Sequence, residues 1–208
     1  MDFFAGNNPE AATELTYSTP YELMVAVVLS AQCTDKRVNI ITPGFFQKFP
    51  DFNTLSKASK DGVFELIKTC SYPNSKAGYL TGIAQAVVSK YNGMLPDSVE
   101  ELQKLPGIGR KTANVIASVA FDKPALAVDT HVFRVSARIG LSFNAKNPLE
   151  TEKQLVKYIP ENRLAIAHHW LILHGRYICQ ARKPKCTECG IREFCKYYEK
   201  QQITASKQ

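Results

Sequence analysis

The residues best suited to chemistry lie in a turn between two expected helices, the segment LPGIGRK at positions 105–111. Its glycines permit tight backbone geometry and the close approach of another backbone. A helix that starts after such a turn points free N–H groups outward, and with the positive end of its dipole they form a phosphate-binding site. Gly107, Gly109 and Arg110 are therefore candidate phosphate contacts. An ordinary helix connection with glycine caps is the competing interpretation.

Lys111 stands in the first turn of the second helix, where the dipole disfavours a cation and structural preference would select Asp or Glu. The dipole and the charge of Arg110 both favour the neutral amine, which is the only nucleophilic form of a lysine. Lys111 is therefore a candidate nucleophile. A lysine at this position could also simply contact phosphate.

Asp129 is the candidate partner of this lysine. It directly precedes a helix expected over residues 130–139, so its carboxylate should accept backbone N–H hydrogen bonds as a cap and remain ionised. A fixed anion can stabilise positive charge that develops on a sugar ring when a base departs, and it can help to move protons around an attacking amine. Capping alone is the competing role, and the two roles are compatible.

Four of the six cysteines lie within 17 residues, in the pattern C-x6-C-x2-C-x5-C. They are Cys179, Cys186, Cys189 and Cys195. Four thiolates suit either a tetrahedral zinc ion or a 4Fe–4S cluster, and the spacing does not decide between the two. Cys33 and Cys70 lie far away in the sequence and are expected to be packing residues.

A short basic loop joins the first two of these cysteines and carries Arg182, Lys183 and Lys185. Ligands at both ends would hold the loop in place and reduce the entropy lost on binding, so its cations could meet a phosphate backbone efficiently. The alternative is a solvated basic loop.

The composition is that of a folded, basic protein. The chain has 208 residues, 45% of them apolar, which suffices for one large or two small domains. A formal net charge of +7 favours a polyanionic partner. The start, Met1–Phe4, has no signal-peptide features, and the apolar run at 23–29 is too short to span a bilayer. We therefore expect no membrane association and a reducing intracellular compartment, where clustered cysteines are metal ligands more often than disulfides.

Helix signals dominate the elements that must position these residues. Thr19, Pro20 and Glu22 indicate a helix start, Asp97 with Glu100 indicates another that Pro106 must end, and Asn92-Gly93 and Gly140 are expected stops. Helices are expected at 75–91, 110–120, 130–139, 148–158 and 163–178, with residues 23–29 buried all round. Only the short stretch 125–128 is ambiguous. The class is all-α, and the tail beyond Tyr198 is expected to be mobile.

With these residues in place, the chain resembles the endonuclease III family of the helix-hairpin-helix glycosylase superfamily over nearly its whole length. The resemblance rests on Leu29–Gln32, Asn74–Ala77, Leu105–Val115, Val128–His131, and Trp170–Cys179 with the cysteine spacing that follows. It implies two helical domains with a DNA cleft between them. One is a six-helix barrel with the hairpin, residues 13–123, and the other is an iron-sulfur cluster domain built from both termini, residues 1–12 and 124–208. It also favours a 4Fe–4S cluster over zinc.

The resemblance implies roles for individual residues. Lys111 matches the family's Schiff-base lysine and Asp129 its essential aspartate. Gln32 matches a residue that fills the gap left by the extruded nucleotide, although a polar helix end is the simpler interpretation. Tyr72 stands where the family has an inserting leucine, so it is either a stacking residue or a turn residue. Cys33 replaces a usual alanine, and the late start of the chain predicts a shortened first helix.

The implied function is a bifunctional DNA N-glycosylase and abasic-site lyase of base excision repair. It would remove oxidised pyrimidines through a lysine Schiff base and cleave the strand 3′ to the abasic site by β-elimination, with the cluster structural. The expected partner is double-stranded DNA with such lesions or abasic sites, and the protein is expected to be a monomer in a bacterial cytoplasm, at the nucleoid. An adenine-mismatch glycosylase is one rival, which Lys111 and the short length disfavour. A non-catalytic DNA-binding module with structural zinc is the other.

Overall fold

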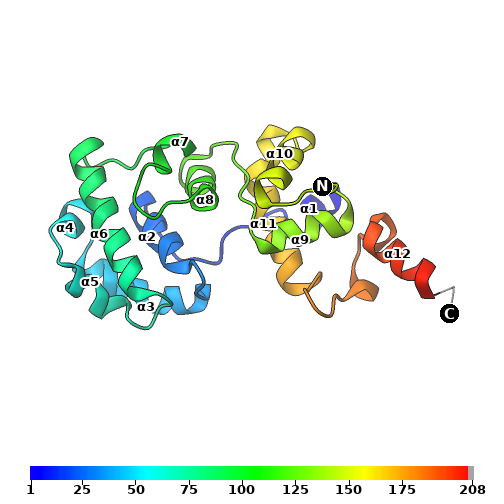
Figure 1. The fold of residues 1–208 in the computed structure, drawn as a ribbon, viewed down its shortest axis with the longest axis horizontal. Coiled ribbons are helices and arrows are strands. Elements are labelled where there is room, and N and C mark those ends of the chain that lie inside the picture. Colours follow the sequence, from blue (N-terminus) through cyan, green and yellow to red (C-terminus); the bar gives the residue numbers. More distant parts are fainter. Residues whose placement is uncertain (206–208) are drawn as a thin grey trace. The chain divides into compact units, whose positions relative to one another are not determined.

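The structure, a computed structural model, describes residues 1–205, and every regular element among them is a helix (Figure 1). The predicted all-α class is confirmed, and the ambiguous stretch 125–128 forms no strand. The chain folds into two compact units. We call Glu14–Ala125 the central unit, and Met1–Thr13 together with the chain from Leu126 onward the terminal unit. Among the helices of residues 1–205, none combines the length and apolar composition that crossing a bilayer requires.

The central unit is built around one buried helix. Its helices are α2 (Pro20–Ser30), α3 (Asp35–Lys48), α4 (Phe52–Ser56), α5 (Lys60–Ile67), α6 (Pro73–Lys90), α7 (Val99–Leu102) and α8 (Arg110–Phe121). Helix α2 packs against α3, α6 and α8, and every residue from Leu23 to Leu29 is buried, as predicted. The Thr19 hydroxyl caps α2 by accepting the N–H of Glu22 at 3.2 Å. The Glu22 carboxylate accepts the N–H of Ser18 instead of closing a box on Thr19.

Side-chain caps start most helices of the central unit, and one predicted cap is wrong. The Asp97–Glu100 box is displaced by one residue, because the Ser98 hydroxyl caps α7 by accepting the N–H of Glu101 at 3.2 Å. Asp97 forms an ion pair with Lys123 at 2.7 Å instead. Helix α7 also ends at Leu102 rather than at Pro106.

The helices α3, α4 and α5 had not been predicted. Each begins at a polar residue whose side-chain oxygen accepts a backbone N–H three residues later: Thr34, Asp51 and Ser59. Helix α6 ends as predicted at Asn92-Gly93, where the Gly93 N–H reaches back to the Val87 carbonyl at 3.0 Å.

The terminal unit joins the two ends of the chain. It contains α1 (Asp2–Asn7), α9 (Thr130–Ile139), α10 (Pro148–Tyr158), α11 (Leu164–Tyr177) and α12 (Lys196–Ala205), with short 3-10 turns at Glu161–Arg163, Cys186–Glu188 and Arg192–Phe194. Helix α11 packs on α9. Trp170 of α11 stacks on Phe4 of α1 with ring centroids 6.3 Å apart, and its indole N–H donates to the Asn8 carbonyl at 2.7 Å. Helix α1 has only six residues, yet it packs into this core.

The ends of α9 and α10 agree with the sequence, whereas the tail differs. Gly140 ends α9 with φ 90°, and α10 has the predicted bounds. The tail beyond Tyr198, expected to be mobile, continues as helix α12 to Ala205, and its residues 206–208 lie outside the described residues.

Candidate functional site

The hairpin between α7 and α8 uses its two glycines differently. Gly107 has φ 72°, and a Cβ added there would lie 2.4 Å from Cγ of Tyr79. Gly109 caps α8 with an ordinary φ of −85°, and a Cβ added there would meet nothing within 4 Å. Gly107 is therefore required by the fold itself. Gly109 leaves open space in front of a helix start, where a phosphate group can approach the first N–H groups of α8.

Lys111 and Arg110 form the exposed first turn of α8. The opposite face of this helix is fixed, because residues 113–118 are buried and α8 packs on α2. The backbone that carries Lys111 is thus held in place while its amine faces solvent. The predicted nucleophile lies on a rigid element and is accessible to a substrate.

Three of the residues predicted to contact DNA come together in one pocket of about 280 Å³. Its lining includes Gln32 after α2, Tyr72 before α6 and Gly107 of the hairpin. Gln32 and Tyr72 adopt left-handed backbone conformations, with φ 54° and φ 55°, and the Tyr72 residue is 63% exposed. Left-handed non-glycine residues cost about 1–3 kcal/mol each and gather at functional sites. Segments 31–32 and 72 thus meet the hairpin at a strained, open pocket.

Lys76 is a positioning residue that the sequence analysis did not identify. It is 4% exposed, and its ammonium donates to the carbonyls of Leu29 at 2.8 Å and Ala31 at 2.7 Å. Burial lowers the pKa of this amine. The contact satisfies the last carbonyls of α2 and so fixes the backbone directly before Gln32. The motif Asn74–Ala77 was the available signal, because it places a lysine in the first turn of the helix predicted at 75–91.

Asp129 caps α9 in the terminal unit, as predicted. One carboxylate oxygen accepts the N–H groups of His131 and Val132, both at 2.8 Å, and the other lies 2.9 Å from Nδ1 of His131. The side chain is 17% exposed. Its carboxylate is therefore held in one orientation while part of it stays open to a ligand.

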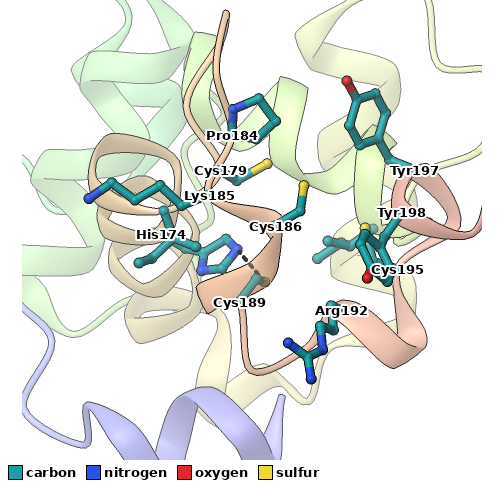
Figure 2. Close-up of a pocket in the computed structure, with 12 residues that line it drawn as sticks. His174, Cys179, Pro184, Lys185, Cys186, Cys189, Arg192, Cys195, Tyr197 and Tyr198 are labelled. Atoms are coloured by element: carbon teal, nitrogen blue, oxygen red, sulfur yellow. Dashed lines mark hydrogen bonds between the residues drawn. The ribbon is translucent and has the colours of Figure 1, made fainter. Parts of the chain in front are cut away.

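The four clustered cysteines line a single pocket at the end of α11 (Figure 2). Cys179 follows α11, Cys186 and Cys189 lie at the 3-10 turn, and Cys195 precedes α12. Within residues 1–205, no three His, Cys, Asp or Glu side chains converge closely enough to hold one metal ion. A tetrahedral zinc ion requires four sulfurs about 2.3 Å from one point. The four thiols line one pocket, and four cysteine thiolates are also the ligands of a 4Fe–4S cluster.

The chemistry of these thiols also fits a cationic group. Burial raises the pKa of the Cys186 thiol, and the neighbouring Cys179 and Cys195 raise it further. Burial likewise raises the pKa of Cys189. Four thiolates in one small pocket repel each other, and bound iron would supply the positive charge that offsets this repulsion.

The basic loop is fastened by Arg138, a second positioning residue that the sequence analysis missed. Its guanidinium donates to the carbonyls of Gln180 at 2.7 Å and Ala181 at 2.8 Å, and to Sγ of Cys179 at 3.5 Å. It also lies over the ring of Tyr197, 4.7 Å from the centroid. Because α9 was predicted with its bounds, an arginine in its last turn was a weak signal for a contact with carbonyl groups.

The loop's three cations, Arg182, Lys183 and Lys185, are exposed. Their backbone is held at both ends, since the Lys185 N–H also donates to the Ile178 carbonyl at 2.9 Å. The loop therefore presents its charges on a fixed backbone.

Cys33 and Cys70, expected to be separate packing residues, touch each other. The Cys33 thiol donates to Sγ of Cys70 at 3.8 Å, and both cysteines are free. Cys70 is buried and Cys33 is half-buried. Sequence separation gave no indication of this contact.

Two family models match the chain. The model described as HhH-GPD superfamily base excision DNA repair protein matches residues 25–161, and the one described as the iron-sulfur binding domain of endonuclease III matches residues 179–195. The endonuclease III of Rickettsia felis is 46% identical over 198 residues, which cover 95% of this chain and 92% of the relative. That of Escherichia coli K12 is 44% identical over 200 residues, covering 95% and 93%.

Solved structures of DNA glycosylases also match the chain. The structure of a trapped endonuclease III–DNA covalent intermediate, an estranged-adenine complex, matches with a TM-score of 0.91 and 42% identity, and the match covers 97% of this chain and 94% of that one. The structure of a thermostable thymine-DNA glycosylase matches with a TM-score of 0.84 and 26% identity, covering 96% and 94%.

Proposed function

The chain belongs to the endonuclease III family of the HhH-GPD superfamily, and from that premise we propose how its own residues perform the reaction. The protein is a DNA glycosylase and abasic-site lyase of base excision repair, and it carries an iron-sulfur cluster, 4Fe–4S. The proposed substrates are oxidised pyrimidines and abasic sites in double-stranded DNA. The observation that carries the proposal is Lys111, an exposed amine on the fixed first turn of α8, behind the open approach at Gly109.

In the proposed reaction the lesion first leaves the base stack, which costs a few kcal/mol and least at damaged bases. The Lys111 nitrogen then attacks C1′ of the deoxyribose, the glycosidic bond breaks, and the base leaves as an anion that takes a proton from water. The carboxylate of Asp129 stabilises the positive charge on the sugar and accepts the proton that the attacking nitrogen loses. Its two backbone hydrogen bonds hold it oriented for that task.

Strand cleavage follows from the covalent intermediate. Opening of the sugar ring gives a Schiff base between Lys111 and C1′, which acidifies the C2′ hydrogens. Removal of one C2′ proton breaks the C3′–O bond, so the strand is cut on the 3′ side, and water then releases the amine. These reaction steps need a primary amine at position 111 and no nucleotide cofactor.

Contacts to the DNA backbone are proposed at two places. In the central unit, the hairpin N–H groups behind Gly107 and Gly109, together with Arg110, meet phosphates without reading sequence. Gln32 and Tyr72 line the pocket beside Gly107. Gln32 fills the space left by the extruded nucleotide, and Tyr72 stacks on the bases of the opposite strand. In the terminal unit, Arg182, Lys183 and Lys185 meet the phosphate backbone from their fastened loop.

Cys179, Cys186, Cys189 and Cys195 would hold the cluster. When bound, the cluster supplies a cross-link between the end of α11 and the start of α12. Because Arg138 ties the basic loop to the same place, we assign the cluster a role in positioning that loop. We further propose that the protein acts as a monomer inside the cell, where its DNA substrate is.

Borohydride trapping tests the lysine mechanism. Borohydride reduces a Schiff base to a stable amine, so wild-type protein incubated with a duplex containing thymine glycol should give a covalent protein–DNA adduct. Lys111→Ala should give none and should lose strand cleavage. Lys104→Ala, which removes an exposed lysine seven residues earlier, is the matched control and should trap like the wild type. Trapping that persists in Lys111→Ala would refute the assignment.

A further inference from the structure

Cys33 and Cys70 form a second cysteine site, separate from the four clustered thiols. Their sulfurs lie 3.8 Å apart although 37 positions separate them in the sequence. A disulfide requires a sulfur separation of about 2.05 Å, so a relative movement of ~2 Å would join them. Both belong to the central unit, which fixes their mutual placement.

The site adjoins the pocket at the hairpin. Cys33 directly follows Gln32, and Cys70 stands two residues before Tyr72. Gln32 and Tyr72 both line the pocket, and both have left-handed backbones. A bond between the two sulfurs would therefore tie together the two segments that present these side chains.

The two thiols differ in their surroundings. Cys70 is 5% exposed, and burial, with the adjacent Cys33, raises its pKa to about 11. The positive charges of Lys76 and Arg37 act on it in the opposite direction. Cys33 is half-buried and so more accessible to a small oxidant. This difference makes Cys33 the thiol that meets an oxidant first and Cys70 the thiol that resolves the product.

We propose that Cys33 and Cys70 are a peroxide-sensitive dithiol that closes to an intramolecular disulfide beside the hairpin pocket. The Cys33 sulfur attacks one oxygen of hydrogen peroxide, the O–O bond breaks, and a sulfenic acid and one water form. The Cys70 sulfur then attacks the Cys33 sulfur and displaces its hydroxyl group, which leaves as a second water with the Cys70 proton. The two thiols lose two electrons in total, and the peroxide gains them.

The disulfide restrains the pocket. It draws the segments at Gln32 and Tyr72 together and prevents them from separating around a DNA strand. Weaker binding to DNA is the expected consequence, and this part of the inference rests on the proposed function. The formation of the disulfide itself does not depend on the proposed function.

Peptide mapping tests the dithiol chemistry. Full-length protein with its cluster is treated with hydrogen peroxide near stoichiometry, free thiols are blocked with N-ethylmaleimide, and the digest is analysed by mass spectrometry without reductant. A peptide pair linked through Cys33 and Cys70 is expected, and dithiothreitol should remove it. Cys33→Ala and, as a polar alternative, Cys33→Ser should lack it, while their four clustered cysteines respond to peroxide as in the wild type. The proposal is overturned if both thiols remain alkylatable at doses that already oxidise the clustered cysteines.

Binding to a duplex with a stable abasic-site analogue tests the restraint. Oxidised wild type should bind at least about threefold more weakly than reduced wild type, dithiothreitol should restore binding, and Cys33→Ala should not respond to peroxide. Equal affinities with the disulfide present would refute the restraint. Reduced protein that fails to bind this DNA would contradict the proposed function instead, and the peptide map would stand apart from that failure.

Discussion

Replacing Gly107 with alanine should destabilise the central unit because of two separate costs. An alanine at φ 72° carries a backbone penalty of about 1–2 kcal/mol. Its Cβ would also lie 2.4 Å from Cγ of Tyr79, an atom that moves only if the whole ring rotates about χ1. Such overpacking costs about 1–3 kcal/mol. Together the two predict a loss of about 2–5 kcal/mol in the free energy of unfolding.

Gly109→Ala is the matched control in the same turn. Its φ is ordinary and no atom lies within 4 Å of the added Cβ, so only the weaker capping ability of alanine remains, about 0.5–1 kcal/mol. The added methyl group does, however, occupy the open approach to α8. We therefore expect Gly109→Ala to keep most of its stability and still lose affinity for DNA.

Urea unfolding of the full-length variants, followed by circular dichroism, measures these differences. A double-mutant cycle of Gly107→Ala with Tyr79→Ala should show a coupling of about 1–3 kcal/mol, because removing the ring relieves the clash and leaves the backbone cost. A Gly107→Ala protein within about 0.5 kcal/mol of the wild type would refute the steric argument. Equal destabilisation by the two alanine variants would refute it as well.

Three further outcomes are expected. Asp129→Asn keeps a good capping residue, so its stability should change by less than about 1 kcal/mol while single-turnover base excision slows at least ~100-fold; an unaltered rate would exclude a chemical role. Arg138→Met removes the hydrogen bonds to the basic loop, so nonspecific DNA affinity should fall about threefold to tenfold in a fluorescence anisotropy titration and the visible cluster absorbance should fade faster under a chelator; unchanged behaviour would contradict the positioning role. Burial lowers the pKa of His169 from 6.5 to about 4, so the unfolded chain binds more protons between these values and stability should fall by about 2–3 kcal/mol as the pH drops from 6.5 to 4. His169→Gln should lose that part of the pH dependence in urea unfolding, and an identical pH profile would show that burial does not govern this residue.

Local signals in the sequence were sufficient where a helix and its cap lie within a few residues. Asp129 and Gly140 delimit α9 because a capping carboxylate and a left-handed glycine act over one helical turn. The prediction that Asp97 caps a helix was wrong because a second good capping residue, Ser98, lies directly beside it. Asp and Ser are about equally good caps, so local signals could not separate Asp97 from Ser98; in the structure Ser98 caps α7 and Asp97 forms an ion pair with Lys123.

Contacts between distant segments could not be predicted in this way. In the sequence, Lys76 cannot be told from any other helical lysine, and its contact with the carbonyl groups at the end of α2 exists only in the folded chain. Cys33 likewise has no cysteine near it in the sequence, although Cys70 lies against it in the structure. The roles of Lys111, of Asp129 and of the cysteine ligands are of a third kind. Residue types and spacing indicated these roles, and membership of the family indicates the reaction. The assignment of each role to its residue stays a prediction, which the experiments above test.

The discontinuity of the terminal unit sets an order on biosynthesis. The central unit is one contiguous stretch, so it can acquire its structure while the ribosome is still working. Residues 1–13 emerge first but must wait for Trp170, which stacks on Phe4 and donates its indole N–H to the Asn8 carbonyl. The proposed cluster site in turn is incomplete until Cys195 has been translated. A ribosome that stalls between these points leaves a finished hairpin attached to an unmetallated, half-assembled partner.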